Sequence, residues 1–180
     1  MTCIVGLVNN NRVYMGADSA SVSVADLVCR PTKLHKMFRR GPFLIGYTTS
    51  FRMGQLLEHW LEVPEQNSKQ PDYEYMVKEF IEAVRSLFKE KGFSNIESNV
   101  ESGGVFLVGY HNKLYTVYSD FQINIAADEF DSVGCGSKFA LGAMAVLLNR
   151  RPEKRIKKAL EIAAFFSGGV CGPFFVDSLK

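Results

Sequence analysis

Few of the residues that build metal centres or disulfide frameworks occur in this sequence. Its 180 residues include four cysteines, three histidines and one tryptophan. Because the cysteines form no CxxC pair and no histidines stand at metal-ligand spacing, we expect reduced thiols, no metal and no cofactor. The scattered histidines also provide no Ser–His–Asp grouping.

Long apolar runs are missing as well. No stretch approaches the roughly 18–20 consecutive apolar residues that span a bilayer. The first residues also lack the basic segment that opens a secretory leader. We therefore expect a protein of the cytoplasm, without a membrane partner.

The sequence also has no large excess of positive or negative charge. The 21 lysines and arginines nearly balance the 19 aspartates and glutamates, so the formal net charge is +2. This small value predicts no nucleic-acid partner, and the short basic clusters at 39–40 and 150–158 are typical of exposed helix faces and turns. The length fits one domain, residues 1–180, with a full-sized core.

The spacing of apolar residues predicts grouped strands and helices. Extended patterns predict strands, and spacings of three and four predict helices. The expected strands are 3–8, 13–18, 33–39, 43–48, 104–110, 114–118, 121–127, 132–135 and 170–178, and the expected helices are 51–61, 73–91, 137–148 and 153–166. Residues 63–72 are expected to form a loop, 19–32 are poorly patterned, and 94–103 are polar. This order predicts an α+β fold, specifically a four-layer αββα sandwich with two antiparallel sheets between helix pairs.

Two segments resemble proteasome β-type subunits and the bacterial protease HslV. Residues 2–8 (TCIVGLV) followed by 13–18 (VYMGAD) are similar to the start of that family. Residues 134–143 (GCGSKFALGA) are similar to its glycine-rich turn into a helix. The resemblance covers essentially the whole chain in the order of its elements, and it implies an N-terminal nucleophile (Ntn) hydrolase.

Thr2 is the expected nucleophile. Removal of Met1 would expose its α-amino group, whose usual pKa of about 7.7–8.0 leaves much of it neutral near pH 7. That amine can then accept the proton of the Thr2 hydroxyl, directly or through one water. Threonine is small enough beside Met1 for ordinary methionine removal, so no long propeptide is required.

The resemblance implies an aspartate and a lysine beside the nucleophile. Asp18, sixteen residues after Thr2, matches the family aspartate. Counting forward from Thr2 points to Lys33 as the lysine, whereas counting back from Gly46 points to Lys36. We favour Lys36, because the strand after it is better defined than the variable loop before it.

Other positions match the family motif less closely. The backbone N–H at Thr49 and Ser50, where the family has glycines, corresponds to the oxyanion donor, and any residue except proline supplies that donor. Cys135 replaces a family serine, and Ala164 stands where the family has an aspartate. Ser167 is retained and is expected near the amine of the nucleophile, although it can instead serve only to turn the chain.

The leading hypothesis is a threonine-type endopeptidase that cleaves peptides or proteins. The resemblance implies a homo-oligomeric ring and an ATP-dependent unfoldase as partner. One alternative is a catalytically inactive assembly subunit, which the absence of an aspartate at Ala164 favours. Another is an amidase that cleaves a small molecule on the same fold.

Overall fold

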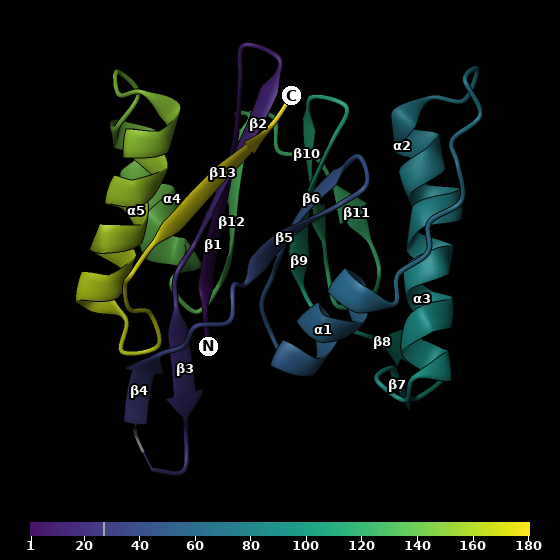
Figure 1. Ribbon diagram of the computed structural model, residues 1–180, viewed down its shortest axis with the longest axis horizontal. Coiled ribbons are helices and arrows are strands. Elements are labelled where there is room, and N and C mark those ends of the chain that lie inside the picture. Colours follow the sequence, from purple (N-terminus) through teal and green to yellow (C-terminus); the bar gives the residue numbers. More distant parts are fainter. Residues whose placement is uncertain (27) are drawn as a thin grey trace.

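Two antiparallel sheets form the middle of the computed structural model, which describes residues 1–26 and 28–180 (Figure 1). The first sheet has the order β12-β1-β2-β13 and the second has the order β11-β10-β9-β6-β5. The first contains β1 (Cys3–Asn9), β2 (Arg12–Ala17), β12 (Phe130–Gly134) and β13 (Phe175–Leu179). The second contains β5 (Met37–Arg40), β6 (Phe43–Tyr47), β9 (Phe106–Tyr110), β10 (Lys113–Val117) and β11 (Ile123–Asn124).

Helices cover the outer face of each sheet (Figure 1). On the four-stranded sheet lie α4 (Ser137–Val146) and α5 (Pro152–Phe166). On the five-stranded sheet lie α1 (Phe51–His59) and a continuous helical stretch of α2 (Asp72–Tyr75), the π-helical η1 (Met76–Phe80) and α3 (Ile81–Glu90). No helix in the described part of the chain is long and apolar enough to cross a membrane.

The side chains of β1 point alternately into two apolar cores. Cys3, Val5 and Leu7 pack with the residues under α4 and α5, whereas Ile4 packs between the two sheets. Successive side chains of a strand point to opposite faces, so one strand supplies both cores. A side chain at Gly46 of β6 would collide with Ile4, and the glycine therefore allows the sheets to approach closely. A third core fills the space between the five-stranded sheet and its helices.

Several predicted boundaries were wrong. The strand expected at 121–127 is only Ile123–Asn124, because Phe121 adopts a positive φ of 66° in a turn. The last strand begins at Phe175 rather than residue 170. The expected loop at 63–72 ends where α2 begins, and the helix expected at 73–91 contains an unexpected π-helical segment.

Two hairpins lie where the sequence shows no strand pattern. They are β3 (Ala20–Ser23) with β4 (Val28–Pro31), and β7 (Asn95–Glu97) with β8 (Val100–Ser102). Residue 27, within the poorly patterned stretch 19–32, lies outside the described residues. β4 and β7 are exposed on both faces. Because neither buries one side against a core, no apolar alternation marks them.

Candidate active site

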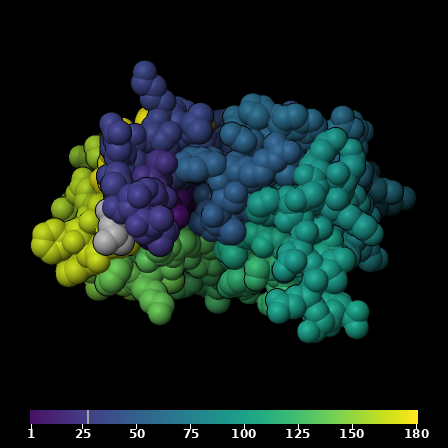
Figure 2. All heavy atoms as spheres, turned by 90° about the horizontal axis from the view of Figure 1, so that it is seen from below, coloured from purple at the N-terminus to yellow at the C-terminus, as the bar shows by residue number. Residues whose placement is uncertain are grey.

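Thr2 lies immediately before β1, where neighbouring strands bring distant residues together. Cys3 pairs with Gly134 of β12, and Ile4 pairs with Ala17 of β2. This register places Asp18 and Cys135 beside Thr2, whose exposed fraction is only 4%. Figure 2 views the molecule from this end, with N-terminal atoms in purple beside the blue-violet segment that includes β3.

Asp18 and Lys36 form a buried ion pair next to Thr2. Lys36 Nζ donates to Asp18 Oδ1 at 2.9 Å, and both side chains are almost completely inaccessible to solvent. Asp18 also accepts hydrogen bonds from the backbone N–H groups of Cys3 and Ala20, each at 2.9 Å, and of Cys171 at 3.4 Å. The carboxylate is therefore fully engaged, as a buried charge requires.

The structure distinguishes the two candidate lysines. Tyr47 N–H donates to the carbonyl of Lys36 at 2.9 Å, and Met37 pairs with Gly46, so β6 fixes the position of Lys36 immediately before β5. Lys36 Nζ reaches the carbonyl oxygen of Met1 at 3.3 Å. Lys33 is exposed. Of these two lysines, Lys36 alone is brought to the Met1–Thr2 peptide.

Met1 occupies the position beside the expected nucleophile. The Thr2 hydroxyl donates to the Met1 carbonyl oxygen, the same atom that Lys36 Nζ contacts. With Met1 attached, the nitrogen of Thr2 is an amide and cannot accept a proton. The adjoining cleft, which Lys36 and residues 47–51 also line, has a volume of only about 30 Å³.

Cys135 contacts Thr2, and Ser167 contacts Cys135. Thr2 N–H donates to Cys135 Sγ at 3.3 Å, and Ser167 Oγ donates to the same sulfur at 3.6 Å. Gly134 has a φ of 99°, and a side chain there would overlap the Thr2 carbonyl oxygen. Ala164 packs against the core under α5 and places no polar group near this cluster.

The turn between β6 and α1 supplies one free backbone donor. Ser50 N–H donates to the carbonyl of Thr48 at 2.6 Å, and Ser50 Oγ caps α1 by accepting from Arg52 N–H at 3.1 Å. Within the described residues, Thr49 N–H has no acceptor, and Thr49 lines the cleft beside Thr2. The sequence could not distinguish these two donors, whereas the turn leaves only Thr49 N–H available.

Some contacts of the site carry no signal in the sequence. Cys171 lies 153 residues from Asp18, yet its N–H binds the carboxylate. Cys3 adjoins Thr2 but is fully buried against the helices. Burial raises the pKa of its thiol to about 12, which disfavours the reactive thiolate. No cluster of three or more potential metal ligands occurs among the described residues.

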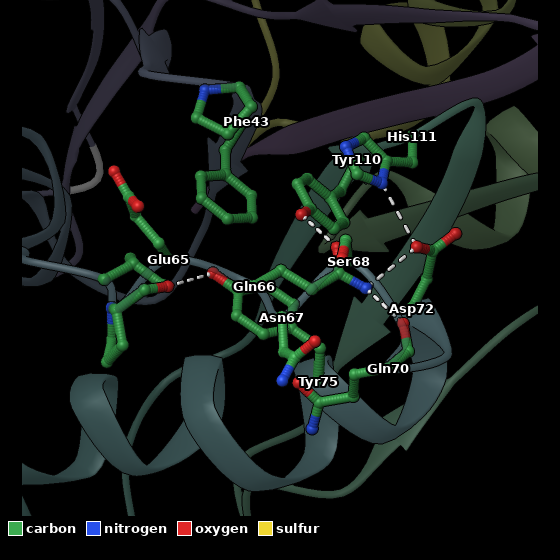
Figure 3. Close-up of a pocket in the computed structure, with 13 residues that line it drawn as sticks. Phe43, Glu65, Gln66, Asn67, Ser68, Gln70, Asp72, Tyr75, Tyr110 and His111 are labelled. Atoms are coloured by element: carbon green, nitrogen blue, oxygen red, sulfur yellow. Dashed lines mark hydrogen bonds and ion pairs between the residues drawn. The ribbon is translucent and has the colours of Figure 1, made fainter.

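A larger hollow of about 570 Å³ lies at the opposite end of the β5–β6 hairpin (Figure 3). No site residue predicted from the sequence lines it. Asp72 accepts hydrogen bonds there from Gln66 at 3.1 Å and Lys113 at 2.9 Å, and it lies 3.1 Å from His111 Nδ1. Burial favours a higher pKa for Asp72, but these hydrogen bonds outweigh it and lower the pKa to about 2.

The fold is similar to those of several solved structures. Thiobacillus denitrificans BPH is 18% identical, with a TM-score of 0.81, over 99% of this chain and 98% of that chain. Eukaryotic HslV from Trypanosoma brucei is 18% identical, with a TM-score of 0.69, over 99% of both chains. Anbu, the ancestral β-subunit from Yersinia bercovieri, is 13% identical, with a TM-score of 0.70, over 99% of this chain and 82% of that chain.

These similarities define a class for the chain. It has the proteasome-like Ntn hydrolase fold, and its structural neighbours are HslV-like proteins and Anbu. No family model and no curated protein sequence matches it. The resemblance drawn from residues 2–18 and 134–143 is thus confirmed at the level of the fold.

Proposed function

We propose that this protein is a threonine-type Ntn hydrolase that cleaves peptide bonds once Met1 has been removed. The observation that carries this proposal is the buried Asp18–Lys36 pair, whose ammonium group lies 3.3 Å from the carbonyl that the Thr2 hydroxyl contacts. A buried ion pair is a weak source of stability, because desolvation offsets the attraction between its charges. Its position beside a potential nucleophile favours a role in catalysis.

The geometry supports a complete reaction. The free amine of Thr2 takes the proton of its own hydroxyl, and the oxygen attacks a substrate carbonyl. Lys36 stabilises the negative charge of the nucleophile, while Thr49 N–H donates to the developing oxyanion. The protonated amine then supplies the proton of the leaving amine, which leaves an ester on Thr2 that water hydrolyses. Cys135 and Ser167 help to orient the amine.

The broader assembly is part of the same proposal. We assign the two sheets and their flanking helices to a four-layer αββα sandwich within a single domain. Phe165 and Phe166 at the end of α5 are 82% and 62% exposed, and exposed apolar clusters mark contact surfaces. They support subunit contacts in a homo-oligomeric ring of the cytoplasm, which would receive unfolded protein from an ATP-dependent unfoldase.

Two observations favour alternative functions on this fold. Ala164 brings no carboxylate to the amine of Thr2, as expected of an inactive assembly subunit. With Met1 attached, the cleft of about 30 Å³ has room only for a water-sized group. Departure of Met1 would open space beside Thr2 that suits a small amide. Both alternatives make predictions that differ from those of an endopeptidase.

The test begins with protein shown by N-terminal sequencing to start at Thr2. Hydrolysis of fluorogenic peptides and of a small aryl amide is compared with hydrolysis by Thr2→Ala, Lys36→Ala and Lys33→Ala. We expect peptide cleavage that the first two substitutions reduce by about 10³-fold or more and that Lys33→Ala leaves unchanged. Cleavage of only the small amide would establish the amidase. Background rates in every protein would establish the inactive subunit.

A further inference from the structure

Thr49 has a backbone conformation that threonine rarely adopts. Its φ of 61° lies in the left-handed region, which disfavours a β-branched side chain. Glycine would adopt this conformation without that cost. Strain of this kind persists where surrounding contacts hold it, so the contacts of the Thr49 side chain indicate what maintains the turn.

Those contacts form a closed ring of hydrogen bonds with the segment that precedes β9. Val105 N–H donates to Thr49 Oγ1 at 3.1 Å, and Thr48 Oγ1 donates to the Val105 carbonyl at 2.9 Å. The two threonine hydroxyls are 3.2 Å apart. Because the Thr48 proton is already given to Val105, the proton between the hydroxyls comes from Thr49. Every hydrogen in the ring then has an acceptor.

Close packing holds the same turn from outside the ring. A side chain at Gly104 would press against Thr49 Cβ and overlap the sulfur of Met53. Residues 104–105 therefore lie directly against Thr49. Thr48 N–H also donates to the Val105 carbonyl at 3.1 Å. The turn is anchored through both threonines, but only the Thr49 hydroxyl anchors the residue whose N–H remains free.

We propose that Thr49 is a positioning residue, whose hydroxyl fixes the direction of its own backbone N–H toward the oxyanion. This inference rests on the proposed hydrolase function. The hydrogen bond from Val105 N–H holds the Thr49 side chain in one orientation. Because the side chain and the backbone N–H are both fixed to the Thr49 backbone, holding the side chain also sets the direction of the N–H. Ser50 N–H cannot replace it, because it is bound to the Thr48 carbonyl at 2.6 Å. A misdirected Thr49 N–H weakens binding of the transition state more than binding of the substrate.

The test compares Thr49→Val, Thr49→Ser and Thr49→Gly in protein that starts at Thr2. Valine removes the hydroxyl and retains the shape, serine retains the hydroxyl, and glycine removes both the hydroxyl and the strain. We expect kcat for peptide hydrolysis to fall by about 10-fold or more with valine and glycine, with KM changed less than about threefold, and to recover with serine. Unchanged kcat in a folded glycine variant, or a valine effect confined to KM, would overturn the proposal.

A second readout is independent of activity. Hydrogen exchange of the peptide that contains Val105 is measured by mass spectrometry in the same four proteins. We expect faster exchange with valine and glycine than with the native residue or serine. Equal exchange in all four proteins would refute the hydrogen bond between Val105 N–H and the Thr49 hydroxyl as the contact that holds the turn. If the native protein is inactive but shows the expected exchange pattern, the proposed hydrolase function is refuted, whereas the hydrogen bond between Val105 and Thr49 is established.

Discussion

Replacing Asp18 by asparagine tests the buried pair most sharply. Asparagine has nearly the same shape, but it removes the negative charge and turns one of the two acceptor oxygens into a donor. In the native protein, Asp18 Oδ1 accepts from Lys36 and Cys3, and Oδ2 accepts from Ala20 and Cys171. In either orientation, the new NH₂ group faces N–H donors. Lys36 also loses its counter-ion in a fully buried position.

The expected cost is about 3–5 kcal/mol, the usual effect of removing one partner from a buried ion pair. This is a large share of a typical unfolding free energy of about 5–15 kcal/mol. With a urea dependence of about 2 kcal/mol per molar, the unfolding midpoint should fall by about 1.5–2.5 M. Circular dichroism during urea unfolding measures the change, at one protein concentration because assembly would alter the midpoint.

The matched control is the double variant Asp18→Asn with Lys36→Met, which removes the stranded ammonium group. We expect it to be more stable than Asp18→Asn alone, and the double-mutant cycle gives the coupling between the two side chains. An Asp18→Asn midpoint within about 0.5 M of the native value would refute the buried pair. Additive effects of the two substitutions would do the same.

Three further predictions concern other parts of the chain. Since burial raises the pKa of Cys3 to about 12, iodoacetamide at pH 8 should label exposed Cys29 and spare Cys3; equal labelling by peptide mapping would contradict this. The pKa of Asp72 is lowered from 3.8 to about 2, so its stabilisation is present above about pH 4 and lost toward pH 2. Urea unfolding should show Asp72→Asn to be destabilised by about 1–2 kcal/mol at pH 6 and by little at pH 2, and an equal loss at both would be inconsistent. Gly134→Ala should abolish peptide cleavage by displacing Thr2, the proposed nucleophile, whereas Gly142→Ala, with open space around it, should leave cleavage unchanged; equal rates in a cleavage assay would refute this.

Much of the site was predictable because it lies beside regular strands. The apolar runs of β1 and β2 mark their ends, and those ends locate Thr2 and Asp18. The choice of Lys36 over Lys33 depended on the length of the preceding loop. Counting back from Gly46 along the paired strands β6 and β5 leads to the lysine that contacts Asp18. Counting forward from Thr2 crosses that loop and leads to Lys33, which is exposed.

The features that sequence reasoning missed depend on tertiary contacts. The β3–β4 and β7–β8 hairpins have no apolar face to reveal them. The bond from Cys171 N–H to Asp18 joins segments 153 residues apart, and any residue except proline could supply that donor. Thr49 was recognised as a departure from glycine, but its bond to Val105 depends on how β9 packs beside the turn.

The central claim is that Thr2 is a nucleophile, and covalent labelling tests it most directly. Protein confirmed to begin at Thr2 is incubated with a threonine-directed covalent inhibitor, a peptide epoxyketone, and its intact mass is measured. We predict one inhibitor per chain, located on Thr2 by peptide mapping and absent from Thr2→Ala. An unchanged mass, or an equal adduct on Thr2→Ala, would contradict the claim.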